Sequence, residues 1–299
     1  NISSIVGQLY KPGDIRIDAG YTIFYMSINI GSMLGFLVCG YLGEKVGWHW
    51  GFGAAGVGMT FGVIQYIFSR KSLGEAGLKP NLEIGEDNSN YKKIFYSALI
   101  VLILVIASNF LGLWSINAEF LNQLTVYAIL LVALLYFTHL FFFAGLNKKE
   151  RENISMFLLL FLGSVLFWAG FDQGGSSLNL FAKDYTDLYI FGWEMPATFL
   201  QVANPLMVVI FAPFFASFWI NLGRKNMDFD TPEKFALGCF LMAVGFCVII
   251  LGVEVAMDNE KAGVKWLLIT YLFHTLGELC LSPVGLAATS KYSPKKYKG

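Results

Sequence analysis

The sequence predicts an all-α protein that crosses a membrane several times. Of its 299 residues, 56% are hydrophobic and only 14% are charged, whereas a soluble domain carries roughly 25% charged residues. Hydrophobic runs near twenty residues recur along the whole chain, and each is long enough to cross an apolar layer of about 30 Å. The expected fold class is therefore a polytopic bundle of helices in contact with the lipid bilayer.

The individual helices follow from hydropathy and from the polar stretches that interrupt it. A stub over residues 1–10 is closed by KPGD, whose Pro and Gly punctuate a helix. The next two spans end at GEK and RK, and a further two lie between NYKK and NKKER. The last four are separated by AKDYTD, GRKNMDFDTPEK and DNEKAG. Full spans are expected at residues 21–42, 49–69, 94–114, 121–144, 154–173, 197–221, 234–256 and 264–287.

The distribution of Lys and Arg predicts the orientation of these spans. Of the 21 Lys and Arg residues, 17 gather on one side of the membrane. That side consists of the loops 11–20, 70–93, 145–153 and 222–234 and the tail from 288. The other side holds only Lys45, Lys183, Lys261 and Lys265. Because cytoplasmic loops carry an excess of Lys and Arg, the first side is predicted to face the cytoplasm.

Glu278 stands about midway along the last span, in HTLGELCLSPVGL. A carboxylate at that depth costs roughly 2.5–3.5 kcal/mol on insertion scales, so it is neutral, paired or functional. No Lys or Arg lies deep within any predicted span, and we therefore interpret Glu278 as a functional carboxylate. His274 lies four residues earlier on the same helix face. It either influences protonation of Glu278 or packs against a neighbouring helix.

Four other residues are candidates, each with two interpretations. Asp172, at the outer end of the fifth full span, is either solvated or part of a gating ion pair with a basic residue on another helix. Trp168, four residues earlier, either lines a cavity or packs at an interface. Asn29 and Asn204 lie within spans, and a buried amide needs hydrogen-bond partners. Another helix or a bound ligand would supply them.

Other classes of function find little support in the residues. The sequence has no Gly-rich phosphate loop, metal-ligand spacing or nucleophile elbow, so we expect neither an enzyme nor a metal site. The three histidines fall at different depths, which speaks against a haem subunit. The four cysteines lack the close pairing of a zinc or redox site. A formal net charge of zero leaves no basic surface for nucleic acid.

Five motifs in a fixed order carry a resemblance to a known family. They are FYMSINIGSM, GWHWGFGAAGVGM, FDQGGSSLNLFA, NPLMVVIFAPFFA and GELCLSPVGL. Together they resemble the proton-dependent oligopeptide transporters of the major facilitator superfamily. The resemblance implies a partial bundle of major facilitator type, from the end of the fourth helix to the tenth. The implied domains are the end of an amino-terminal bundle at 1–69, a cytoplasmic linker at 70–93, two inserted helices at 94–146 and the first four helices of a carboxy-terminal bundle at 147–299.

The resemblance also implies a function and a set of site residues. Members of the family import di- and tripeptides by proton-coupled symport with alternating access, with protons as coupling ion and no other cofactor. Glu278 matches the residue that receives the peptide amino group, and Asn29, Trp168 and Asn204 match other peptide contacts. Asp172 matches a gate partner of a basic residue on the first helix, although the family usually has Glu there. The implied location is the bacterial inner membrane.

Some alternatives remain open at this point. A family member that carries nitrate or another small solute, or a membrane subunit that does not transport, would share the same composition. The family motifs of the first helix, the fourth-helix Lys, and helices eleven and twelve are not in this chain, so we expect the segment alone not to transport. Neither peptide preference nor oligomeric state follows from the sequence.

Overall fold

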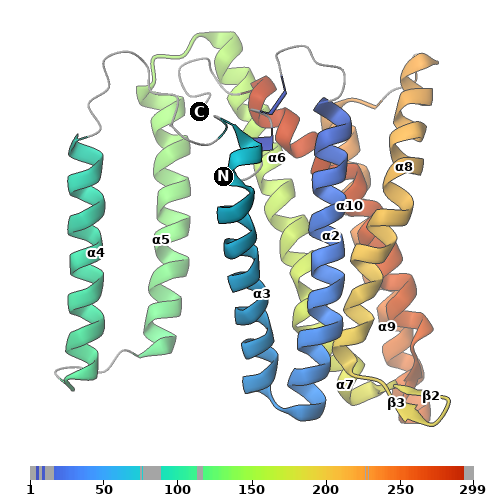
Figure 1. The fold of residues 1–299 in the computed structure, drawn as a ribbon. Helices are drawn as coiled ribbons and strands as arrows, with labels where there is room; N and C mark the ends of the chain where they lie inside the picture. The colour runs from blue at the N-terminus through green and yellow to red at the C-terminus, as the bar shows by residue number, and fades with distance from the viewer. Residues whose placement is uncertain are drawn as a thin grey trace. The chain divides into compact units, whose positions relative to one another are not determined.

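The computed structural model describes residues 5–6, 9–10, 17–74, 76, 89–112, 117–225, 227 and 229–292. These residues form helices joined by short turns, and within them six helices are long and apolar enough to cross a membrane. The predicted all-α membrane bundle is therefore confirmed (Figure 1). Most of the stub at 1–10 and most of the linker at 70–93 lie outside the described residues.

The chain divides into two compact units, Leu78–Arg151 and the combination of Asn1–Gly77 with Glu152–Gly299. The first unit contains α4 (Ser89–Phe110) and α5 (Ala118–Thr138), which continues as the π-helical turn η3 (His139–Phe143). Asn117 begins α5, since its side chain accepts a hydrogen bond from the backbone N–H of Glu119 at 2.9 Å and so caps the helix. Large apolar side chains on both helices are exposed, as expected of helices that face lipid.

The second unit holds the remaining helices. In chain order they are α2 (Ile17–Tyr41), η1 (Leu42–Val46), α3 (Trp48–Ser69), η2 (Arg70–Leu73), α6 (Lys148–Phe171), η4 (Asp172–Gly175), α7 (Ser177–Tyr185), η5 (Ala197–Val202), α8 (Ala203–Arg224), α9 (Thr231–Asn259) and α10 (Lys265–Tyr292). Each predicted span coincides with one long helix, displaced by a few residues at its ends. The boundaries of the four predicted domains stay predictions.

The helices α9 and α10 pack against each other along most of their length. The buried positions of α9 repeat at alternating intervals of three and four residues: Phe235, Gly238, Met242, Gly245, Ile249, Gly252 and Ala256. This spacing is that of a coiled-coil seam. Each of the three glycines leaves space for a part of α10. These parts are the backbone of Gly277 beside Gly238, the ring of His274 beside Gly245 and the side chain of Trp266 beside Gly252. Small residues at such a seam let membrane helices approach closely.

The connection between α6 and α8 contains structure that hydropathy does not reveal. The short helix α7 is followed by β1 (Thr186–Asp187), which pairs in parallel with β4 (Ala262–Gly263). The strands β2 (Tyr189–Ile190) and β3 (Trp193–Glu194) form an antiparallel hairpin. Its turn residues Phe191 and Gly192 both have positive φ, of 50° and 81°, as a two-residue hairpin turn requires. These elements are too short for a periodicity argument to detect them.

Candidate functional site

Glu278 lies buried in α10, with only 8% of its side chain exposed. Each of its carboxylate oxygens accepts one hydrogen bond from a different helix. Tyr25 on α2 donates its hydroxyl to Oε1 at 3.0 Å, and Asn204 near the start of α8 donates Nδ2 to Oε2 at 3.0 Å. The carboxylate therefore joins α2, α8 and α10, three helices that are far apart in the sequence.

Thr275 fixes the orientation of the Asn204 amide. Its hydroxyl donates to the carbonyl oxygen of Tyr271, one turn earlier on α10, at 2.7 Å. The hydroxyl proton is thereby used, so the oxygen of Thr275 accepts from Asn204 Nδ2, at 2.9 Å. The amide nitrogen carries two N–H donors, and both are now committed, one to Thr275 and one to Glu278. Oε2 of Glu278 is consequently held as an acceptor.

The donors around Glu278 are neutral groups. Within the part of the chain that the structure describes, no lysine, arginine or histidine forms an ion pair with this carboxylate. A buried carboxylate with hydrogen bonds but no opposite charge is only partly compensated for its loss of hydration. Chemically, this arrangement can accept a proton or a cationic group. The Tyr25 hydroxyl can adapt to a protonated carboxyl, because a hydroxyl both donates and accepts.

Asn29 belongs to the same region of the site. It is buried in α2, one helical turn after Tyr25, and its Nδ2 donates to the Tyr25 carbonyl at 2.9 Å. Hydrogen bonds thus connect three of the predicted site residues: Asn204 bonds to Glu278, and Asn29 is linked to Glu278 through Tyr25.

The other two predicted site residues, Trp168 and Asp172, lie on α6 and η4, which in the described part of the chain supply no hydrogen bond to Glu278. Trp168 is 37% exposed on α6 and makes edge-to-face contacts with Phe171 and Phe167, at centroid distances of 5.1 Å and 5.5 Å. Asp172 begins η4 and is exposed, and its carbonyl accepts a 3.4 Å hydrogen bond from Ser176. Among the described residues, the hydrogen bonds of Glu278 come from Tyr25 and Asn204, not from Trp168 or Asp172.

His274 faces away from the carboxylate. It is buried against α9, with its ring 4.9 Å from that of Phe246 and close to Gly245. Glu278, four residues later, contacts α2 and α8 instead. Of the two interpretations of His274, the structure supports the packing role between α9 and α10.

Tyr25 and Thr275 are the site residues that the sequence analysis missed. Tyr25 lies four residues before Asn29, and Thr275 lies three residues before Glu278. Residues at these spacings share one face of a helix. A search for polar side chains one turn from each buried candidate would have found both.

Comparison with known proteins identifies the family of the chain. The sequence model of the POT family matches residues 1–299. The chain belongs to the POT family. It is 36% identical to the peptide transporter YePEPT of Yersinia enterocolitica over 309 residues, covering 100% of this chain and 60% of the relative. It is 30% identical to dipeptide and tripeptide permease B of Salmonella typhimurium, covering 100% of this chain and 59% of that protein.

Solved POT structures share the fold. A crystal structure of a peptide transporter POT in complex with sulfate aligns with a TM-score of 0.87 at 36% identity, over 100% of this chain and 60% of that one. The chain thus spans about 60% of the length of its POT relatives. These relatives are transporters, and the chain is a multi-pass protein of the bacterial inner membrane, as POT proteins of bacteria are.

Proposed function

We propose that the whole protein imports di- and tripeptides by proton-coupled symport, alternating between states open to either side of the membrane. The observation that carries the proposal is the Glu278 carboxylate, buried between three helices with two neutral donors. The relatives named as peptide transporters support the choice of substrate.

The chemistry of a short peptide fits this site. A free peptide carries an ammonium at one end and a carboxylate at the other, so a site needs an acidic and a basic end. Glu278 is the acidic end, where an ammonium gains charge-assisted hydrogen bonds. The resemblance implies that the basic end lies on helices of the relatives that this chain does not contain.

The remaining site residues would hold the peptide amino terminus in place. Asn204 and Tyr25 orient the Glu278 oxygens, and Asn29 stands one turn from Tyr25. On the resemblance, Trp168 lines the peptide pocket and Asp172 pairs with a first-helix basic residue as a gate. No metal or organic cofactor is needed in this scheme, since the coupling ion is the proton.

The single negative charge of Glu278 can be neutralised by one positive partner at a time. A proton and a peptide ammonium both neutralise Glu278, and the low dielectric of the surroundings makes one positive partner strongly favourable. One carboxylate holds only one of the two partners at a time, so it does not by itself couple their movement in the same direction. The resemblance implies that the residues that carry proton coupling lie on the first helix, which is not in this chain. Nitrate, which is an anion, gains nothing from this carboxylate, so a nitrate carrier is not favoured.

The test is binding calorimetry on the full-length protein with dialanine and with N-acetyl-dialanine. Acetylation removes the ammonium and leaves the rest of the peptide in place. Dialanine should bind, and the acetylated peptide should bind at least about tenfold more weakly because a charge-assisted contact of 1.5–3 kcal/mol is lost. Equal affinity for both peptides would remove the ammonium from the proposal. Addition of nitrate should leave the dialanine affinity unchanged.

A further inference from the structure

Glu44 joins two segments that are distant in the sequence, on the side predicted to face outward. It lies in η1, the turn between α2 and α3, and accepts hydrogen bonds from the backbone N–H groups of Ala197 and Thr198, each at 3.0 Å. These are the first two residues of η5, which continues directly into α8. The first N–H groups of a helix have no partner within it, and a carboxylate there is favoured by the helix dipole.

Lys45, the next residue, makes a second contact to the same segment. Its Nζ lies 3.1 Å from Oε2 of Glu194 in β3, with the two side chains 30% and 52% exposed. An exposed ion pair of this kind contributes little by itself. The two hydrogen bonds of Glu44 are charge-assisted and partly buried, and such bonds are roughly twice as strong as neutral ones. Glu44 therefore contributes more than Lys45 to the stability of this contact.

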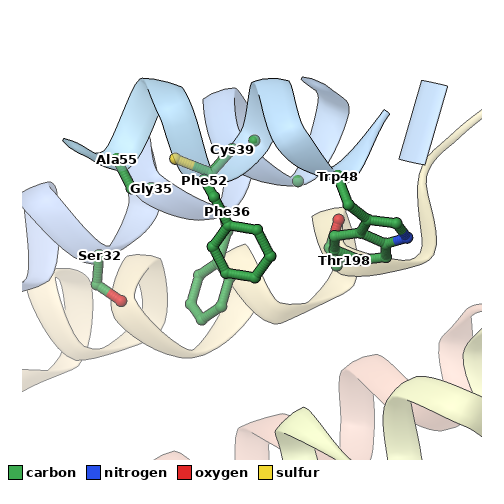
Figure 2. Close-up of a pocket in the computed structure, with 10 residues that line it drawn as sticks. Ser32, Gly35, Phe36, Cys39, Trp48, Phe52, Ala55 and Thr198 are labelled. Atoms are coloured by element: carbon green, nitrogen blue, oxygen red, sulfur yellow. The ribbon is translucent and has the colours of Figure 1, made fainter. Parts of the chain in front are cut away.

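Close packing supports the same contact. A Cβ atom on Gly40 of α2 would collide with the hydroxyl of Thr198, and the Thr198 Oγ1 is fully buried. Figure 2 shows Thr198 beside the Trp48 ring, at one end of a groove of about 430 Å³ between α2, α3 and η5. The outer ends of α2 and η5 thus lie in direct contact.

Glu44 is distant from Tyr25 along its own helix, whereas the residues that it contacts, Ala197 and Thr198, lie only seven and six residues before Asn204. At about 1.5 Å per helical residue, Glu44 lies roughly 28 Å along the helix from Tyr25. Glu44 therefore does not contact a ligand at Glu278. What it holds is the amino end of the helix that carries Asn204, one of the two donors to Glu278.

We propose that Glu44 and Lys45 form an outer latch, defined by their contacts to Glu194, Ala197 and Thr198, that closes the outer side of the passage and opens in each transport cycle. Glu44 is the positioning residue of the latch and acts through η5. The opening of the latch rests on the proposed function, because alternating transport requires the outer side to open. The closing role of the latch does not depend on which substrate is carried.

The closing role can be tested with a buried reporter. In the full-length protein, Thr198→Cys places a thiol where the hydroxyl is buried, and a membrane-impermeant maleimide is added from outside. The signal of the parent protein, which includes the four cysteines of this chain, is subtracted. Glu44→Ala should raise the labelling rate by about fivefold or more, because opening the latch no longer breaks charge-assisted bonds. Asp258→Ala, which removes an exposed carboxylate at the end of α9, should leave the rate unchanged. An unchanged rate in Glu44→Ala would overturn the latch.

The opening role can be tested by a reversible cross-link. Lys45→Cys and Glu194→Cys are joined by a short bis-methanethiosulfonate linker, and dipeptide uptake is measured before linking, after linking and after reduction. Uptake should fall at least about tenfold on linking and return on reduction. The control pair, Asp187→Cys and Gly263→Cys, links the paired strands β1 and β4 and should retain its uptake.

The two tests separate the latch from the proposed function. Undiminished uptake after linking of Lys45→Cys to Glu194→Cys would contradict the opening of the latch. Failure of peptide transport itself would show as absence of dipeptide uptake before any linking. In that case the labelling of Thr198→Cys still decides whether Glu44 holds the outer side closed, since it needs no substrate.

Discussion

Asn204 on α8 donates a 3.0 Å hydrogen bond to Glu278 on α10, with an amide whose second N–H is held by Thr275. The two residues are 74 positions apart in the chain, and their contact joins two helices of the site. The orientation of the amide is imposed by the Thr275 hydroxyl, which already donates its hydrogen bond to the Tyr271 carbonyl and therefore accepts from Asn204. The Glu278 carboxylate is therefore held in one geometry by a chain of hydrogen bonds that begins in the backbone.

Replacement of Thr275 by valine should weaken peptide binding. Valine has nearly the same shape but no acceptor, so one buried N–H of Asn204 loses its partner, at a cost of about 1–3 kcal/mol. We expect the dialanine affinity of the full-length protein to fall about fivefold or more in calorimetry. Thr275→Ser keeps the hydroxyl and should bind like the parent protein. If valine and serine behave alike, Thr275 does not orient the amide.

Tyr25→Phe should also weaken binding, by a different route. The substitution removes the hydroxyl that donates to Oε1 of Glu278 and keeps the aromatic ring. Loss of one hydrogen bond to a charged group, about 1.5–3 kcal/mol, should lower the dialanine affinity about tenfold. N-acetyl-dialanine, which has no ammonium to meet the carboxylate, should be affected much less. An equal loss for both peptides would show that Tyr25 acts on general packing.

Gly245→Ala tests the seam between α9 and α10. A Cβ at this position would lie 2.5 Å from the His274 ring, which has no free space because it is buried. Overpacking of this kind costs about 1–3 kcal/mol, so the thermal unfolding midpoint of the detergent-solubilised full-length protein should fall. Gly163→Ala is the matched control, because its Cβ would meet Phe235 at an ordinary 3.8 Å. A midpoint unchanged in Gly245→Ala would contradict the close approach of the two helices.

The long helices and Glu278 were accessible to sequence reasoning for simple physical reasons. A membrane helix must be continuously apolar over its length, so its position shows in composition alone. A carboxylate inside such a helix is costly, and it therefore stands out. Asn29 and Asn204 stand out for the same reason, since a buried amide requires partners.

Other parts of the structure depend on contacts that no local pattern encodes. Tyr25 and Thr275 are ordinary residues in membrane helices, and only the hydrogen bonds to Glu278 and Asn204 show their role. The hydrogen bond between Glu44 and Ala197 spans 153 residues and ends on a backbone atom, which any residue except proline would supply. The hairpin of β2 and β3 is too short to show a strand periodicity.

The most direct test of the central claim is proton-driven dipeptide uptake by the Glu278→Gln variant of the full-length protein in liposomes. Glutamine has the same shape, and it can accept a hydrogen bond from Asn204 while donating one to Tyr25, so the site should stay folded. The variant lacks the charge that binds a proton or an ammonium. We predict that uptake driven by a proton gradient is abolished. Undiminished uptake would contradict the account and remove Glu278 from the mechanism.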